Sequence, residues 1–267
     1  MSDPMKSKPL TYISYLHLDE LLTLQQPRSA GPEHDEMLFI VVHQVYELWF
    51  KQVLHELRRL RDTLTAGDSP GSLAALKRIL TILKTLVAQV DVIETMTPAS
   101  FNSFRSRLEA ASGFQSHQFR ELEFILGHKR AELVEKYPED SVPRRVLQTL
   151  LDEPTVFDAF FRYLKHHGYA VPDSALNRKV RDSIQPSSEV QELLLAVYKQ
   201  NDFAAQLCER LVDLDEGLQE WRYRHVKMVE RTIGMKMGTG GSTGVNYLRE
   251  TLFKPLFPDL WEIRSRL

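Results

Sequence analysis

One uninterrupted stretch of helix-forming sequence limits the folds that this chain can adopt. From Glu33 to Leu64 there is no glycine or proline, and apolar residues recur at steps of three and four. This spacing predicts one long amphipathic helix with a wide buried face. The residues predicted to form that face are Phe39, Val42, Tyr46, Trp49, Val53, Leu57, Leu60 and Leu64. Such a helix favours a fold built on long helices.

A second long helical region is predicted nearer the C-terminus, because 187–233 contains no proline. Its apolar positions alternate four and three apart, which is the spacing of a buried seam. These positions are Leu207, Leu211, Leu214, Leu218, Trp221, His225 and Met228. Further helices are predicted at 10–24, 72–94, 99–110, 115–126, 129–136, 143–151, 155–166 and 245–253, and 172–186 is expected to be irregular. No segment alternates as a strand does, so the predicted fold class is all-α, a bundle of long helices.

Two helix starts can be assigned from cap residues. Thr97 followed by Pro98 is a typical N-cap and first helical residue. Ser72 is expected to cap the helix over 72–94, with Pro70 and Gly71 acting as breakers before it.

Length and charge narrow the class of protein. A chain of 267 residues is within reach of one large domain whose core can enclose a cofactor. Its 34 basic and 36 acidic residues are interspersed, which argues against a nucleic-acid-binding face. The single cysteine, Cys208, excludes an intramolecular disulfide and a cysteine-built metal or iron–sulfur site. The N-terminus has no apolar signal segment and no apolar run approaches membrane-spanning length, so we expect a cytoplasmic protein without membrane contact.

Several catalytic motifs fail on their context. The residues 240–244 match the G-x-S-x-G nucleophile elbow, but a predicted helix precedes them and no histidine follows Ser242. The same loop lacks the Gly-Lys-Ser/Thr ending of a phosphate-binding loop. His55-Glu56 is not followed by the second histidine of a zinc-protease motif, and the paired Glu-x-x-His motifs of a di-iron bundle are absent from the sequence.

Two isolated histidines remain, one on each of the longest predicted helices. His43 lies one turn after Phe39 at the edge of the apolar stripe, and His225 occupies a seam position. A lone histidine on a buried seam suits haem ligation, because the porphyrin supplies four of the iron's donors. A second histidine in an aromatic pocket suits the opposite side of the haem. The spacing fits equally a pair of histidines that are merely packed in the core, so by itself it leaves both interpretations open.

Five sequence blocks resemble those of a known family. They are HDEMLFIVVHQVYELWFKQ (34–52), FNSFR (101–105), SGFQSHQFRELEF (112–124), WRYRHVKMVERTIGMKMGTGGSTG (221–244) and LFPDLWEIR (256–264). In this order, and over nearly the whole chain, they resemble the tryptophan 2,3-dioxygenases. The resemblance implies a homotetramer of all-α subunits that uses ferrous haem b and O2. It implies opening of the indole C2–C3 bond of L-tryptophan to give N-formyl-L-kynurenine, the first step of the kynurenine pathway.

The resemblance also implies roles for individual residues. His225 would be the axial iron ligand, and Ser112 would lie near the haem edge. His43 would meet the indole N–H, and whether it also removes that proton is left open. Arg105 would pair with the substrate carboxylate, since its planar fork suits bidentate binding. The implied substrate pocket consists of Phe39, Ile40, Val41, Val42, His43, Phe101, Arg105 and Thr239, completed by Tyr12, Tyr15 and Leu16 of a neighbouring subunit.

The resemblance divides the chain into two parts. Residues 1–32 are expected to dock on a neighbouring subunit, and residues 33–267 to form a single haem-binding catalytic domain. His117 stands where relatives usually carry an apolar residue, and we interpret it as a tolerated substitution at a helix surface. Two alternatives are a related haem oxygenase acting on another indole and a haem-free helical scaffold. Arg105 disfavours an indole without a carboxylate, because an unpaired buried charge is costly.

Overall fold

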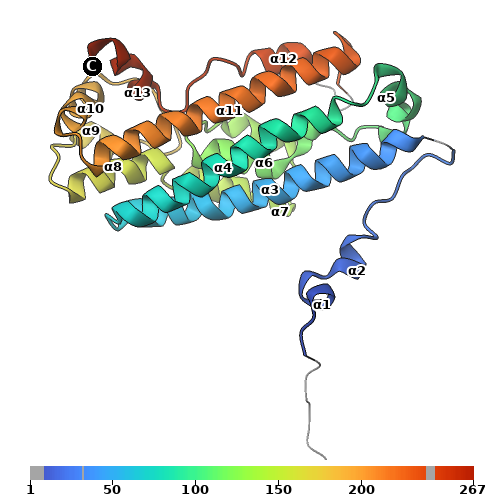
Figure 1. Ribbon diagram of the computed structural model, residues 1–267. Coiled ribbons are helices and arrows are strands. Elements are labelled where there is room, and N and C mark those ends of the chain that lie inside the picture. Colours follow the sequence, from blue (N-terminus) through green and yellow to red (C-terminus); the bar gives the residue numbers. More distant parts are fainter. Residues whose placement is uncertain (1–8, 32, 239–243) are drawn as a thin grey trace, which may run out of the picture.

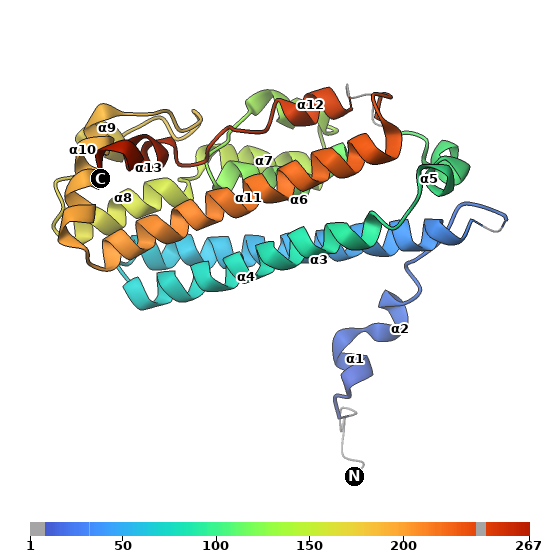
Figure 2. The same cartoon turned by 45° about the horizontal axis from the view of Figure 1, so that its top comes forward.

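Three long helices form the body of the molecule. The computed structural model describes residues 9–31, 33–238 and 244–267, and all regular elements within these ranges are helical, so the predicted all-α class is confirmed. The helices α3 (His34–Thr65), α4 (Ser69–Ile93) and α11 (Phe203–Ile233) run alongside one another (Figures 1 and 2), and α4 packs on both of the others. The first predicted long helical region therefore becomes α3, and the second contains α11.

Shorter helices cover this body. The helices α6 (His117–Ile125) and α8 (Val156–His166) pack on α3, and α7 (Val142–Asp152) packs on α6. The remaining elements are α1 (Tyr12–Leu16), α2 (Leu18–Leu21), α5 (Pro98–Arg105), α9 (Asp173–Leu176), α10 (Ser188–Gln200), α12 (Val245–Arg249), α13 (Pro258–Glu262) and the 3-10 turns η1 (Ser106–Leu108), η2 (Gly113–Gln115), η3 (Ala131–Lys136) and η4 (Ile263–Arg266). Within the described ranges, none of the helices combines the length and apolar character needed to cross a membrane.

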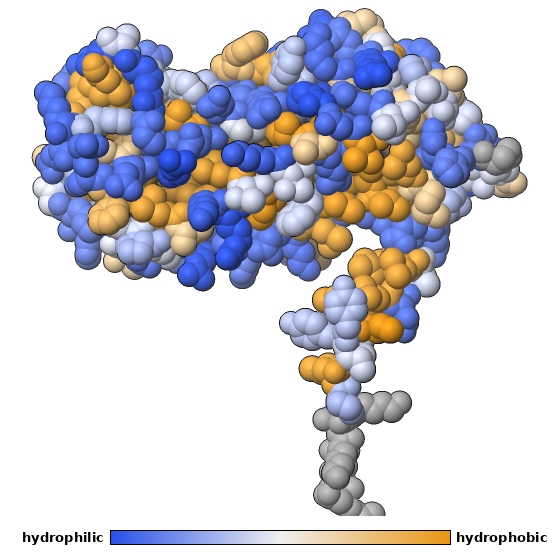
Figure 3. All heavy atoms as spheres, viewed as in Figure 1, coloured by the Kyte–Doolittle hydropathy of each residue, from blue (hydrophilic) through white to orange (hydrophobic). Residues whose placement is uncertain are grey.

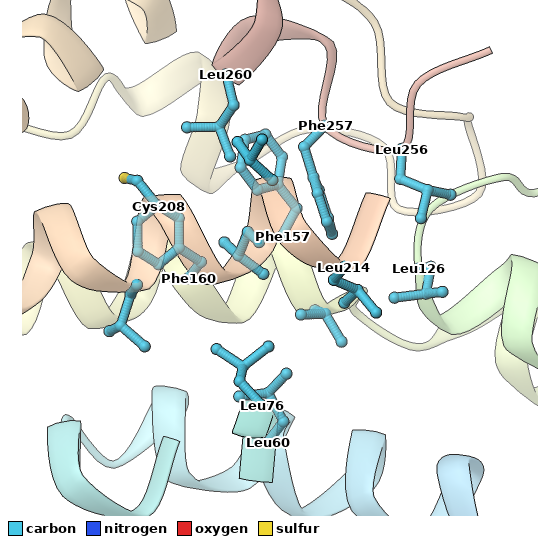
Figure 4. Packing of buried hydrophobic residues seen from close by; sticks show 14 of the residues in the cluster. Leu60, Leu76, Leu126, Phe157, Phe160, Cys208, Leu214, Leu256, Phe257 and Leu260 are labelled. Carbon is cyan, nitrogen blue, oxygen red and sulfur yellow. The ribbon is translucent and has the colours of Figure 1, made fainter. Parts of the chain in front are cut away.

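The core joins the central helices to the C-terminal segment. Figure 4 shows Leu60 of α3 and Leu76 of α4 pointing toward Phe160 of α8 and Phe257 near the C-terminus. All four side chains are fully buried within one apolar cluster. Burial of apolar surface is the main favourable contribution to folding, so this cluster holds distant parts of the chain in one body.

Local capping chemistry explains where the helices begin. The prediction for Thr97 and Pro98 is confirmed, because Thr97 is the N-cap of α5 and accepts the backbone N–H of Ser100. The prediction that Ser72 is the N-cap of the second long helix is wrong. That helix, α4, begins at Ser69, three residues earlier.

Asp68 is the true N-cap of α4, and its carboxylate accepts the backbone N–H of Gly71. Pro70 lies in the first turn, where a missing N–H leaves no hydrogen bond unmade. A Cβ on Gly71 would lie 2.1 Å from Asp68 Oδ2, so glycine allows the carboxylate to approach closely. Pro70 and Gly71, which were interpreted from the sequence as helix breakers, therefore lie in the first turn of α4.

Asn201 and Asp202 divide the predicted helical region 187–233 into α10 and α11. Asn201 has a φ of 49°, in the left-handed region, and ends α10. Asp202 then caps α11 by accepting the backbone N–H groups of Ala204 and Ala205. Asparagine and aspartate tolerate these roles at helix ends, so the absence of proline did not ensure one continuous helix.

Other predicted boundaries differ by a turn or in helix type. The helix predicted at 99–110 leaves the α-helical conformation after Arg105, and the one predicted at 129–136 is the 3-10 turn η3. The helix predicted at 115–126 begins only at His117, and the last predicted helix ends at Arg249. The short helix α9 lies within the region expected to be irregular.

Replacing Asp68 with alanine is expected to destabilise the protein by about 1 kcal/mol, because the N–H of Gly71 loses its acceptor. For a chain of this size that corresponds to a fall of about 2–4 °C in the midpoint of thermal unfolding. Asp68→Asn is the control, since asparagine also caps helices and should retain most of the stability. Equal losses in both variants would contradict the capping role.

Residues 9–31 project from the body (Figure 1). Tyr12 and Tyr15 of α1 are 73% and 69% exposed, and in Figure 3 much of this segment is apolar surface. Near its attachment to the body, Gln44 of α3 donates a hydrogen bond from Nε2 to the carbonyl oxygen of Leu24 at 3.1 Å. The expected docking on a neighbouring subunit stays a prediction.

Candidate active site

A large cavity lies at one end of the three-helix body, between α3, α5, α6 and α11. Its volume is about 1720 Å³ including the open mouth. Among the residues predicted from the sequence, those that line the cavity are Phe39, His43, Phe101, Arg105, Ser112 and His225. The fold thus brings together residues from opposite ends of the sequence.

His225 lies on the cavity wall contributed by α11. Burial and, to a smaller extent, the nearby His43 together lower the pKa of His225 to about 4, so its imidazole is neutral at pH 7. Within the described part of the chain, we find no hydrogen bond to this ring. A neutral imidazole with a free nitrogen lone pair is the form that ligates a metal ion.

His43 presents a hydrogen-bond acceptor to the same cavity. Its Nδ1 lies 2.7 Å from the carbonyl oxygen of Phe39. Because a carbonyl oxygen only accepts, Nδ1 carries the proton, and Nε2 is left as an acceptor. Burial lowers the pKa of His43, which keeps the ring neutral. The rings of Phe39 and His43 are in contact, with centroids 4.1 Å apart.

Arg105 lies at the end of α5 and reaches the loop that follows α11. Its Nη2 donates a hydrogen bond to the carbonyl oxygen of Met237 at 2.6 Å. Phe101, one turn earlier on α5, is buried and lines the cavity beside it. No carboxylate pairs with Arg105 in the described ranges, so its other N–H groups can receive a carboxylate from a ligand.

Three arginines converge on one buried carboxylate at a further part of the wall. Glu123 is 1% exposed, and its oxygens lie 2.6 Å from Arg120 Nη1, 2.8 Å from Arg130 Nη2 and 3.0 Å from Arg222 Nη2. Burial alone would raise the pKa of Glu123, but the three guanidinium groups hold it below its usual value. We call these four residues the arginine cluster. Its formal charge is +2, and Arg120 and Arg222 line the cavity.

Lowering the pH from 7 to 5 is expected to destabilise the haem-free protein. A histidine ordinarily has a pKa of 6.5, whereas that of His225 is about 4 and that of His43 is also lowered. Between these values the unfolded chain binds more protons than the folded one, so the free energy of unfolding falls as the pH falls. Urea unfolding at pH 7 and pH 5 measures this loss. His225→Gln should lose less than the wild type over the same interval, and an equal loss would contradict the assignment.

Comparison with known proteins identifies the family. The family described as tryptophan 2,3-dioxygenase matches residues 2–168 and 187–267. The chain belongs to the tryptophan 2,3-dioxygenase family. The tryptophan 2,3-dioxygenase of Herpetosiphon aurantiacus is 59% identical over 261 residues, which are 98% of this chain and 100% of the relative. That of Anaeromyxobacter dehalogenans is 59% identical over the full length of both chains, and that of Caulobacter vibrioides is 43% identical over 98% of this chain and 100% of its own.

Some residues that the family resemblance placed in the substrate pocket point elsewhere. The side chains of Ile40, Val41 and Val42 do not line the cavity, although they lie between Phe39 and His43. Val42 is buried in the core, and Val41 is 39% exposed. The reason is helical geometry, since only residues three or four apart share a face.

Other predicted residues lie away from this cavity or outside the described ranges. Tyr12, Tyr15 and Leu16 are on the projecting α1 of this chain. Thr239 falls outside the described residues, but Gly238 and Gly244 on either side of its loop line the cavity.

His117 is half-buried at the first position of α6 and does not line the cavity. It lies close enough to lower the pKa of Glu121, which burial otherwise raises. The interpretation of His117 as a tolerated substitution at a helix surface stays a prediction.

Proposed function

We propose that this chain is a haem-dependent dioxygenase that opens the indole C2–C3 bond of L-tryptophan with O2 and forms N-formyl-L-kynurenine. Both oxygen atoms enter the product, so the overall reaction balances without an external reductant. The observation that carries the proposal is the cavity in which a neutral His225, the acceptor nitrogen of His43 and the guanidinium of Arg105 meet in a chain of this family.

The residues present fit haem b. His225 offers a neutral imidazole that would hold the iron, and the largely apolar wall would suit a porphyrin face. The arginine cluster supplies excess positive charge for the two propionates, which are carboxylates of the kind that arginine binds well. Ser112, which lines the cavity at the start of η2, would lie near the haem edge. When bound in the ferrous form, haem supplies the iron at which O2 is activated.

The protein's own contribution is to bind and orient the substrate. Arg105 would hold the carboxylate of L-tryptophan in a bidentate pair, and Nε2 of His43 would accept the indole N–H. Phe39 would pack on the indole ring. Two polar contacts at opposite ends of the substrate fix the indole in one orientation, which lowers the entropic cost of reaching the reactive geometry. His43 need only hold this proton, since its role as an acceptor is sufficient for positioning.

We also propose that the active form is a homotetramer in which residues 1–32 of one subunit dock on a neighbour. Tyr12, Tyr15 and Leu16 would then close the mouth of the neighbour's cavity. The exposed aromatic and apolar side chains of α1 support this arrangement, because such surface is normally covered by a partner. Thr239, in the loop after α11, would close over the amino-acid end of the substrate from within the same subunit.

The test is an absorbance assay on purified, haem-reconstituted and reduced protein with L-tryptophan and O2. Formation of N-formylkynurenine would support both the substrate and the reaction. A Soret band without turnover would favour a different indole substrate. Failure to take up haem would overturn the proposal in favour of a scaffold protein.

A further inference from the structure

The indole of Trp221 lies directly against the imidazole of His225. Both residues are on α11, one turn apart, and their ring planes are within 3° of parallel with centroids 5.2 Å apart. This separation is within the range of offset aromatic stacking. Within the described ranges no hydrogen bond reaches the His225 ring. The stack with Trp221 is therefore the contact that can orient this ring.

Trp221 is itself held from several sides. Its ring contacts Tyr46 and Phe50 of α3, at centroid distances of 6.1 and 6.0 Å, and Phe119 of α6 at 5.1 Å. The side chain is 9% exposed, so these contacts leave it little room to rotate. The orientation of the Trp221 plane is therefore set by two helices other than its own.

We propose that Trp221 is a positioning residue that fixes the plane of the axial imidazole by stacking. The proposal rests on the proposed function, in which His225 ligates the haem iron. The side-chain torsion that turns an imidazole is broad and soft, so a ligating histidine needs a second contact to set its plane. That contact is usually a hydrogen bond from the other ring nitrogen to a carboxylate or carbonyl. Here the indole takes this role, and the ligand stays a neutral imidazole without a carboxylate partner to increase its basicity.

The first test replaces the His225 side chain with free imidazole, so that binding of the ring can be measured with and without Trp221. In haem-loaded His225→Gly, free imidazole should restore axial ligation, and its dissociation constant can be titrated by absorbance. Adding Trp221→Leu should weaken imidazole binding about three- to tenfold, the range expected for loss of one aromatic stack. Adding Trp49→Leu instead is the matched control, because Trp49 packs on the core but does not line the cavity. Equal imidazole affinity in all three backgrounds would overturn the proposal.

The second test uses the intact ligand. Resonance Raman spectra of the ferrous protein report the iron–histidine stretching band. We expect Trp221→Met, which keeps apolar bulk without a ring, to broaden or shift this band, and Trp49→Leu to leave it unchanged. A wild-type band in Trp221→Met would overturn the stacking role. If His225→Gly itself leaves the haem spectrum unchanged and does not respond to imidazole, the axial role of His225 fails instead, so the two failures are distinguishable.

Discussion

Replacing Arg105 with leucine is expected to lower kcat/KM for L-tryptophan about 30- to 1,000-fold, mainly through a higher KM, while haem stays bound. The range follows from the loss of about 2–4 kcal/mol when one partner of a hydrogen-bonded charge pair is removed. Arg105 touches the loop carbonyl of Met237, and no carboxylate of the described chain competes for it. Steady-state kinetics with L-tryptophan, together with a Soret spectrum, measures both parts of the expectation.

The substrate offers the matched control for Arg105. Tryptamine keeps the indole and the amino group but lacks the carboxylate, so Arg105→Leu should leave its binding nearly unchanged. Arg105→Lys should give an intermediate loss for L-tryptophan, because lysine keeps the charge but not the planar pair of donors. A similar loss for tryptamine and L-tryptophan in Arg105→Leu would show that the arginine supports the cavity rather than recognising the carboxylate.

The sequence predicts the central helices well, for a physical reason, whereas the roles of the site residues come only from the family resemblance. A long apolar stripe can be buried along only one face, so the stripe on α3 and the seam on α11 oriented His43 and His225 before any packing was known. Thr97 and Pro98 likewise marked the start of the helix that carries Arg105, although the role of Arg105 was implied only by the resemblance. Periodicity did not show that these side chains share one cavity, since that depends on how separate helices pack.

The boundaries that were predicted wrongly involve competition between local signals. At α4, the pair Pro70 and Gly71 resembles a break, yet both residues fit a first turn that Asp68 caps. At Asn201, one left-handed residue ends a helix in a region without proline. Such choices are decided by hydrogen bonds worth about 1 kcal/mol, which sequence patterns resolve poorly.

The arginine cluster was not predicted, because its members come from three segments and meet only in the folded chain. The sole local signal is the spacing of Arg120 and Glu123 on α6, which is common on exposed helix faces as well. Burial distinguishes this pair from a surface pair, and burial here depends on Arg222 of α11 and Arg130 of the segment after α6.

Replacing Glu123 with glutamine is expected to destabilise the haem-free protein by about 3–5 kcal/mol, the usual cost of breaking a buried ion pair. The variant leaves three guanidinium groups without a neutralising charge, and those of Arg120 and Arg222 are buried. In a chain of this size, the thermal midpoint should fall by about 6–20 °C. Asp152→Asn is the control, because its partner Arg181 lies only 2.5 Å away but both side chains are more than half exposed. Exposed pairs contribute about 0–1 kcal/mol, so the control should change little.

Haem loading should reduce the penalty of Glu123→Gln if the cluster faces the propionates as proposed. The cofactor's two carboxylates would then supply part of the negative charge that the substitution removes. Glu123→Gln should therefore lower the thermal midpoint less when both wild type and variant are loaded with haem than when both are haem-free. Acid acts in the same direction as the substitution, because protonation also removes the charge of Glu123. The pKa of Glu123 is held below its ordinary 4.5. Its stabilising charge is therefore present above pH 4.5 and is lost as the pH falls through the folded-state pKa. An identical fall with and without haem would show that the arginines stabilise only the protein and do not hold the cofactor.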